Sequence, residues 1–138
     1  MDGLSKTERA YFNAAKAVSS LSDHRVHVGA VVVHQHRIIS SDCNSSTRTD
    51  AIQAKLDQAH FGCYCEGKIH AESACLIPYI KRNINLSGGT IYVYREHKNG
   101  SIAMARPCER CMSLIKKAGI KKVYYSTESG FAKEYIEL

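Results

Sequence analysis

Two short clusters in the sequence combine residue types that bind zinc and move protons. The first is H-A-E at residues 70–72, and the second is P-C-E-R-C at residues 107–111. Because Cys108 and Cys111 are three residues apart, one helical turn can direct both sulfurs to a single point, and His70 can add a nitrogen. Three protein ligands leave the fourth zinc position open, which is typical of catalytic rather than structural zinc.

Glu72 follows His70 by two residues, so it need not be a ligand and can face the open position. Zinc lowers the pKa of a water ligand to about 7. A carboxylate beside that water can accept its proton and pass it to a substrate atom. The pattern predicts His70, Cys108 and Cys111 as zinc ligands and Glu72 as the catalytic proton shuttle.

Both clusters must lie at the starts of neighbouring helices. Apolar spacing predicts a helix over 70–82, despite Pro78 inside it, and another over 109–118 that ends at Gly119. Positive helix starts would stabilise the two thiolates. Strands over 90–95 and 120–126 flank the second helix, and because strands joined through a helix run parallel, we expect a parallel pair.

The remaining segments complete an α/β pattern. We predict a helix over 4–21 that begins with a Ser5–Glu8 capping box, and a hairpin of strands 28–33 and 37–40. A polar insertion then reaches about residue 68, with a short helix over 51–60, and a further hairpin turns at Asn99-Gly100. Residues 131–138 are too short to assign. We predict one domain over residues 1–138, with a sheet and helices on its faces.

H-x-E followed by P-C-x-x-C is the signature of zinc-dependent nucleobase deaminases. The sequence resembles the cytidine and deoxycytidylate deaminase superfamily over roughly residues 26–126, including HVGAVVV at 27–33 and the segment 106–126. It is most similar to the deoxycytidylate branch, in which the first zinc ligand is histidine. The resemblance implies a three-layer α/β/α fold with a central mixed sheet.

The resemblance also implies a reaction, in which the cytosine base of a pyrimidine nucleotide, dCMP or CMP, is hydrolysed to uracil and ammonia. Asn44 falls where the family holds the sugar, and the backbone around Ala71 would contact the base. Arg48, Arg95 and Arg106 adjoin predicted pocket loops or strand ends, and of these we name Arg106 as a substrate-binding residue.

Two departures from the family bear on the substrate. Residues 96–106 separate the third strand from Pro-Cys, where the family often has only a few residues, so the pocket rim is unusual. The loop after Asn44 also lacks the Asn-Gly pair that is common in deoxycytidylate deaminases.

Charge keeps a second enzymatic hypothesis open. The net charge is +6 and the pI is about 9.0, with the basic excess in the C-terminal half. A cytosine deaminase that acts on single-stranded DNA or RNA would suit this charge and the added hairpin. The lysine-rich segment 116–122 is more typical of a solvated helix end than of a nucleic-acid contact. A non-catalytic zinc-binding module is a third hypothesis, against which Glu72 argues.

Composition sets the remaining expectations. The chain has 138 residues and a hydrophobic share of 44%, so its 6 cysteines need not form disulfides, and metal binding in a reducing compartment is the better use. A second zinc site could be built by Cys43, His60, Cys63, Cys65 and His97, although free thiols are the alternative. No segment is apolar and long enough to cross a membrane, and no signal core opens the chain.

We therefore expect a cytoplasmic protein without a membrane partner. We also predict a homo-oligomer that covers apolar side chains such as Leu114, Ile115, Val123 and Tyr125, with a neighbouring copy completing the rim near Asn44 and Arg106.

Overall fold

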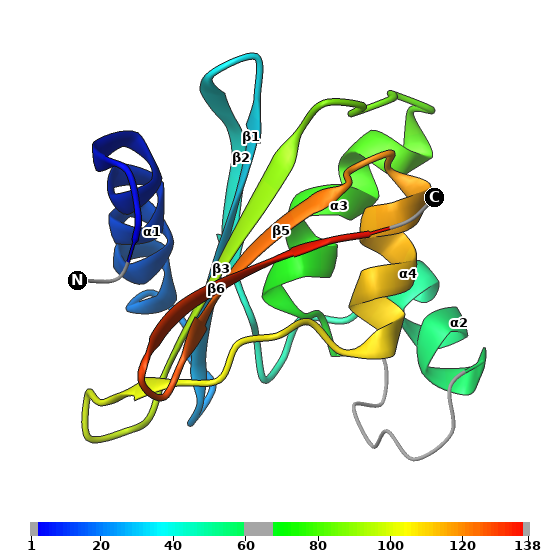
Figure 1. Cartoon of the computed structure of the whole chain (residues 1–138). Coiled ribbons are helices and arrows are strands. Elements are labelled where there is room, and N and C mark those ends of the chain that lie inside the picture. Colours follow the sequence, from blue (N-terminus) through cyan, green and yellow to red (C-terminus); the bar gives the residue numbers. More distant parts are fainter. Residues whose placement is uncertain (1–2, 60–67, 137–138) are drawn as a thin grey trace.

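The computed structural model describes residues 3–59 and 68–136, and within them six strands form one mixed sheet (Figure 1). The strand order is β2-β1-β3-β5-β6, and β4 pairs with the end of β3. β3 and β5 are parallel, as expected for strands joined through a helix, and every other pair is antiparallel. The elements, in chain order, are α1 (Lys6–Ser19), β1 (His27–His34), β2 (Arg37–Cys43), α2 (Ala51–Ala59), α3 (Ala71–Lys81), β3 (Thr90–Glu96), β4 (Ile102–Ala103), α4 (Glu109–Lys117), β5 (Lys122–Thr127) and β6 (Gly130–Tyr135).

Helices cover both faces of the sheet, which confirms the three-layer α/β/α fold with a central mixed sheet. α1 packs on one face, and α3 and α4 pack on the other (Figure 1). The two faces follow from the alternation of side chains along β3. Ile91 and Val93 join the core beneath α3 and α4, whereas Tyr92 and Tyr94 join an aromatic cluster beneath α1.

The first helix begins as its sequence predicts. The Ser5 hydroxyl accepts the Glu8 N–H at 3.1 Å, and the Glu8 carboxylate accepts the Ser5 N–H at 2.8 Å, which is a complete capping box. α1 then approaches β1 very closely at Gly29. A Cβ at that position would lie 2.2 Å from the Ala15 carbonyl oxygen, so only glycine allows this packing.

Several elements differ in extent from the expected ones. β2 continues to Cys43, so the polar loop begins later than predicted. The hairpin after β3 is present, but β4 holds only two residues. The C-terminal segment that the sequence left unassigned is β6, which pairs with β5 along its whole length. Its alternation of apolar and polar side chains is weak, because β6 is an edge strand and most of its residues are only half-buried.

The apolar side chains that were expected to need a neighbouring copy are largely covered within the chain. Leu114, Ile115 and Val123 are buried in the core between the sheet and α4, and Tyr125 is half-buried. The expectation that a neighbouring copy must cover these three side chains is therefore wrong. The homo-oligomer itself stays a prediction. None of the helices in the described residues is both long and apolar enough to span a membrane.

Candidate metal and substrate site

His70 occupies the N-cap position of α3, with an extended backbone that ends the preceding loop. Its N–H donates to the Ser73 hydroxyl at 2.9 Å, and the same hydroxyl donates a short hydrogen bond to Oε1 of Gln53 in α2. Gln53 is fully buried. These contacts fix the backbone of His70 and connect it to the insertion between β2 and α3. Sequence reasoning missed Gln53, because nothing in a short polar helix distinguishes an inward-facing glutamine from an exposed one.

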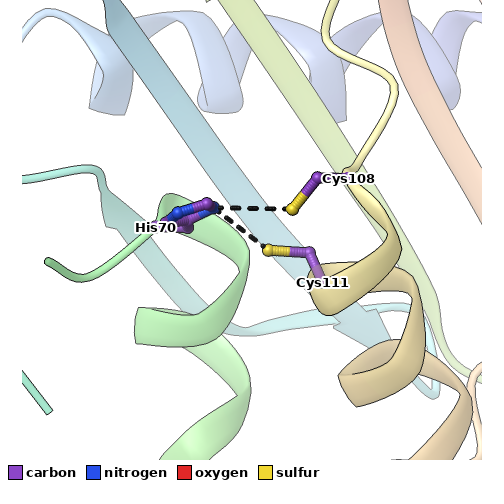
Figure 2. A group of neighbouring side chains, drawn as sticks. All are labelled: His70, Cys108 and Cys111. Atoms are coloured by element: carbon purple, nitrogen blue, oxygen red, sulfur yellow. Dashed lines mark hydrogen bonds between the residues drawn. The ribbon is translucent and has the colours of Figure 1, made fainter. Parts of the chain in front are cut away.

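The two cysteines of P-C-x-x-C lie on the first turn of α4, with Cys108 at the N-cap. Figure 2 shows both sulfurs directed toward the ring of His70 from the neighbouring helix start. The Nδ1 atom of His70 lies 3.4 Å from Cys111 Sγ and 3.8 Å from Cys108 Sγ. One ligand atom from each residue lies within 4.8 Å of the others, and no other such group occurs in the described part of the chain.

This donor set fits zinc. One imidazole nitrogen and two sulfurs are ligands that zinc commonly takes, and three protein ligands leave a tetrahedral position open. The local electrostatics favour thiolate at the first cysteine. The hydrogen bond from Cys111 and the neighbouring His70 lower the pKa of Cys108 to about 4, even though burial opposes the charge. Cys111, which is fully buried and donates to Cys108, has its pKa raised.

Glu72 lies in the first turn of α3 and is only 5% exposed. Burial raises the pKa of its carboxyl group, and the charge on His70 opposes that shift. A carboxyl group with a raised pKa holds a proton more readily than an exposed glutamate does, which suits a group that must deliver a proton.

A cavity of about 450 Å³ opens over these residues, and its wall includes His70, Glu72 and Cys108. Ala71, which was expected to contact the base, is buried in the same wall, and Asn44 and Arg106 also line the cavity. The structure thus brings together all the site residues that the sequence named, except that Cys111 lies behind the wall. Sequence reasoning gave no sign of three further lining residues, His24, Lys68 and Met104.

Asn44 holds the loop that forms one side of the cavity. Its Oδ1 accepts the Val28 N–H at 3.0 Å and the Ser22 hydroxyl at 2.6 Å, and its Nδ2 donates to the Val26 carbonyl at 2.9 Å. Three hydrogen bonds therefore orient the amide, and one Nδ2 hydrogen has no acceptor among the described residues. That geometry leaves a donor for a ligand hydroxyl.

The three arginines that the sequence singled out have different surroundings. Arg48 follows the loop of Asn44, Ser45 and Ser46 that lines the cavity, but it forms an ion pair with Asp42 at 3.2 Å and does not itself line the cavity. Arg106 lines the cavity, but Nε and one terminal nitrogen each donate to the Glu134 carboxylate at 2.8 Å. Arg95 lines the cavity from the end of β3.

The second zinc site falls mostly on residues that the structure does not describe. His60, Cys63 and Cys65 lie outside the described residues. Cys43 ends β2 and is half-buried, and burial raises the pKa of its thiol. Within residues 3–59 and 68–136, no metal-binding group includes Cys43 or His97.

The fold and the site together define a zinc-binding deaminase domain, and comparison with known proteins agrees. The family model described as "cytidine and deoxycytidylate deaminase zinc-binding region" matches residues 5–127. The chain belongs to this family, as its motifs predicted, and zinc is the family's cofactor.

Three relatives illustrate the likeness. The dCMP deaminase of cyanophage S-TIM5 is 29% identical in its apo form, with a TM-score of 0.57 over 85% of this chain and 79% of the phage chain. The same enzyme was also solved in complex with dCMP and dUMP. Cytidine deaminase from Burkholderia pseudomallei shares the fold, with a TM-score of 0.63, 16% identity and coverage of 96% and 93% of the two chains.

ComE operon protein 2 of Bacillus subtilis (strain 168) is 31% identical over 109 residues, which are 75% of this chain and 50% of that protein. The chain thus spans about half the length of the curated relative that it matches.

Proposed function

We propose that this domain hydrolyses the amino group of cytosine in a pyrimidine nucleotide such as dCMP or CMP, giving uracil and ammonia. His70, Cys108 and Cys111 hold the zinc ion, and Glu72 moves the protons. The observation that carries the proposal is the convergence of a histidine, two cysteines and a buried glutamate on one cavity, from two helix starts.

Each residue has a defined part in the reaction. Zinc, when bound, acidifies a water molecule so that it can act as a nucleophile near neutral pH. Glu72 accepts a proton from the attacking water as a bond forms between the water oxygen and C4 of the base. Glu72 then delivers the proton to the ring nitrogen. It next carries the hydroxyl proton to the amino group, so that the C4–N bond breaks and ammonia leaves.

The cavity favours a nucleotide over an uncharged nucleoside. Lys68, Arg95 and Arg106 contribute positive charge to its wall, and Glu72 is the one acidic residue among the described lining residues. A phosphate group complements this charge. The dCMP and dUMP complex of the cyanophage relative supports the same substrate class. In this proposal Asn44 donates to a sugar hydroxyl and the backbone of Ala71 contacts the base, and the position of both residues in the cavity wall supports these roles.

The test is ammonia release from a panel of dCMP, CMP, deoxycytidine, cytidine and a cytosine-containing oligonucleotide. We expect the highest kcat/KM with one of the two monophosphates. Faster turnover of the oligonucleotide would instead assign the domain to polynucleotide deamination. Zinc-loaded protein that turns over none of the five would leave only zinc binding and would refute the proposal.

A further inference from the structure

Among the described residues, the buried side-chain polar atom without a hydrogen-bond partner is Nε of Arg95, which lines the cavity. The Nε atom of Arg95 is shielded from solvent and makes no hydrogen bond within the structure. Leaving such a donor unsatisfied opposes folding, and more strongly so for a charged group. Nearly all buried donors in folded proteins have partners, and exceptions are concentrated where a ligand supplies the missing acceptor.

The sheet places the side chain of Arg95 on the face that carries the site. Side chains two residues apart in a strand share a face, so Arg95 lies on the same side of β3 as the core residue Val93. Its neighbour across the ladder in β1 is Val28, which also lines the cavity. Arg95 is therefore directed into the space that Glu72 borders.

The backbone of Arg95 is fixed by the hairpin that separates β3 from Pro-Cys. β5 pairs with β3 only as far as Val93, and β4 takes over at Arg95, which is opposite Ala103. The buried Ser126 joins these segments, because its hydroxyl accepts the Arg95 N–H at 3.0 Å and donates to the Ala103 carbonyl at 2.8 Å. This support fixes the backbone from which the Arg95 guanidinium extends.

Arg95 differs from the other arginine in the cavity. One edge of the Arg106 guanidinium, formed by Nε and one terminal nitrogen, is engaged by the Glu134 carboxylate. Arg95 has no acidic partner among the described residues, and its Nε is unsatisfied. The base and the sugar of a nucleotide are uncharged, so its phosphate is the one part that can neutralise a guanidinium. Arginine also presents parallel N–H donors that match phosphate oxygens.

We propose that Arg95 binds the phosphate group of the nucleotide substrate and so makes the site prefer nucleotides to nucleosides. The inference rests on the proposed function for the identity of the ligand. The proposal also gives residues 96–106, which include β4, a structural role. They hold the end of β3, and with it Arg95, at the rim of the cavity.

The test compares binding of dUMP and deoxyuridine, the products with and without phosphate, to zinc-loaded protein by calorimetry. Arg95→Met should weaken dUMP binding about 10- to 100-fold, as expected for loss of a charged hydrogen bond, and leave deoxyuridine binding unchanged. Arg37→Met is the matched control, because it removes the same charge from an exposed arginine at the opposite end of the sheet. It should bind both products as the wild type does.

Thermal unfolding separates a binding role from a structural one. Without nucleotide, Arg95→Met should unfold at the same temperature as the wild type or above it, because the substitution removes an unsatisfied buried donor. Added dUMP should raise the unfolding temperature of the wild type and of Arg37→Met, but much less that of Arg95→Met.

Three results would overturn the inference. One is equal dUMP affinity in Arg95→Met and the wild type, another is an equal loss of dUMP and deoxyuridine binding, and the third is a wild type that binds no dUMP. The two proposals can also fail separately. If Arg95→Met weakens dUMP binding but the wild type does not deaminate dCMP, the phosphate contact is supported and the proposed reaction is refuted.

Discussion

The polar groups on the two faces of β3 differ in whether the chain itself supplies their partners. Beneath α1, the tyrosine hydroxyls have acceptors within the chain, since Tyr124 donates to Glu8 and Tyr94 to Glu96. Tyr92 stacks on Tyr124 and meets Phe12 edge to face. Beneath α3 and α4, two thiols and an imidazole converge on one point, and Nε of Arg95 at the end of the strand has no acceptor among the described residues.

This difference separates stability from function along a single strand. On the α1 face, apolar burial and satisfied hydrogen bonds both favour the folded chain. On the opposite face, burial of charged and metal-binding groups opposes folding unless a ligand is present. Substitutions on the α1 face should therefore change stability and spare the chemistry, and substitutions on the other face should do the reverse.

The largest effect is expected at the metal. Cys111→Ala removes one of three proposed zinc ligands, so zinc content should fall from about one ion per chain to near zero, and deamination should fall to background. Elemental analysis and an ammonia assay measure both quantities. Cys75→Ala is the control, because Cys75 is equally buried in α3 but belongs to the core. Zinc retained by Cys111→Ala would exclude this ligand.

A large loss of stability is expected where α1 meets β1. Gly29→Ala would bring a methyl group against the Ala15 carbonyl at 2.2 Å, and the backbone of α1 would have to move. We expect the free energy of unfolding to fall by about 3 kcal/mol, at the upper end for overpacking. Denaturant titration measures the change. A denaturation midpoint equal to that of the wild type would show that α1 does not pack this closely against β1.

The smallest effect is expected in the aromatic cluster. Tyr124→Phe removes the hydroxyl that donates to Glu8 and retains the ring. The free energy of unfolding should therefore fall by about 1 kcal/mol. The kcat and KM for the best nucleotide should stay within experimental error of the wild type. A change in kcat much larger than the change in stability would contradict the separation of the two faces.

Much of the fold could be predicted because local signals agreed with one another. The Ser5–Glu8 capping box, the strand pattern around Val31 and the two motif-bearing helices each appear as expected. β6 was not predicted, because an edge strand with one weakly buried face has little hydrophobic alternation and is defined by its pairing with β5.

The site was predicted unevenly for a physical reason. The spacing of Cys108 and Cys111 follows from helix geometry, and the joint signature of H-x-E and P-C-x-x-C indicated that His70 and Glu72 lie beside them. The partners of the arginines could not be predicted in this way. Arg106 meets Glu134 only because β6 returns beside β5, and Arg95 lies where β4 replaces β5 along β3. Such contacts depend on tertiary pairing, and no local pattern encodes them.

The most direct test of the central claim is the activity of Glu72→Gln in protein with its zinc content measured. The substitution retains the size of the side chain and its place beside His70, but it removes the group that carries the proton. We predict about one zinc per chain, an unfolding temperature at least that of the wild type, and a kcat/KM for dCMP lower by about 10²–10⁴-fold or more. A zinc-loaded variant with wild-type turnover would contradict the assignment of Glu72 and, with it, the proposed reaction at this site.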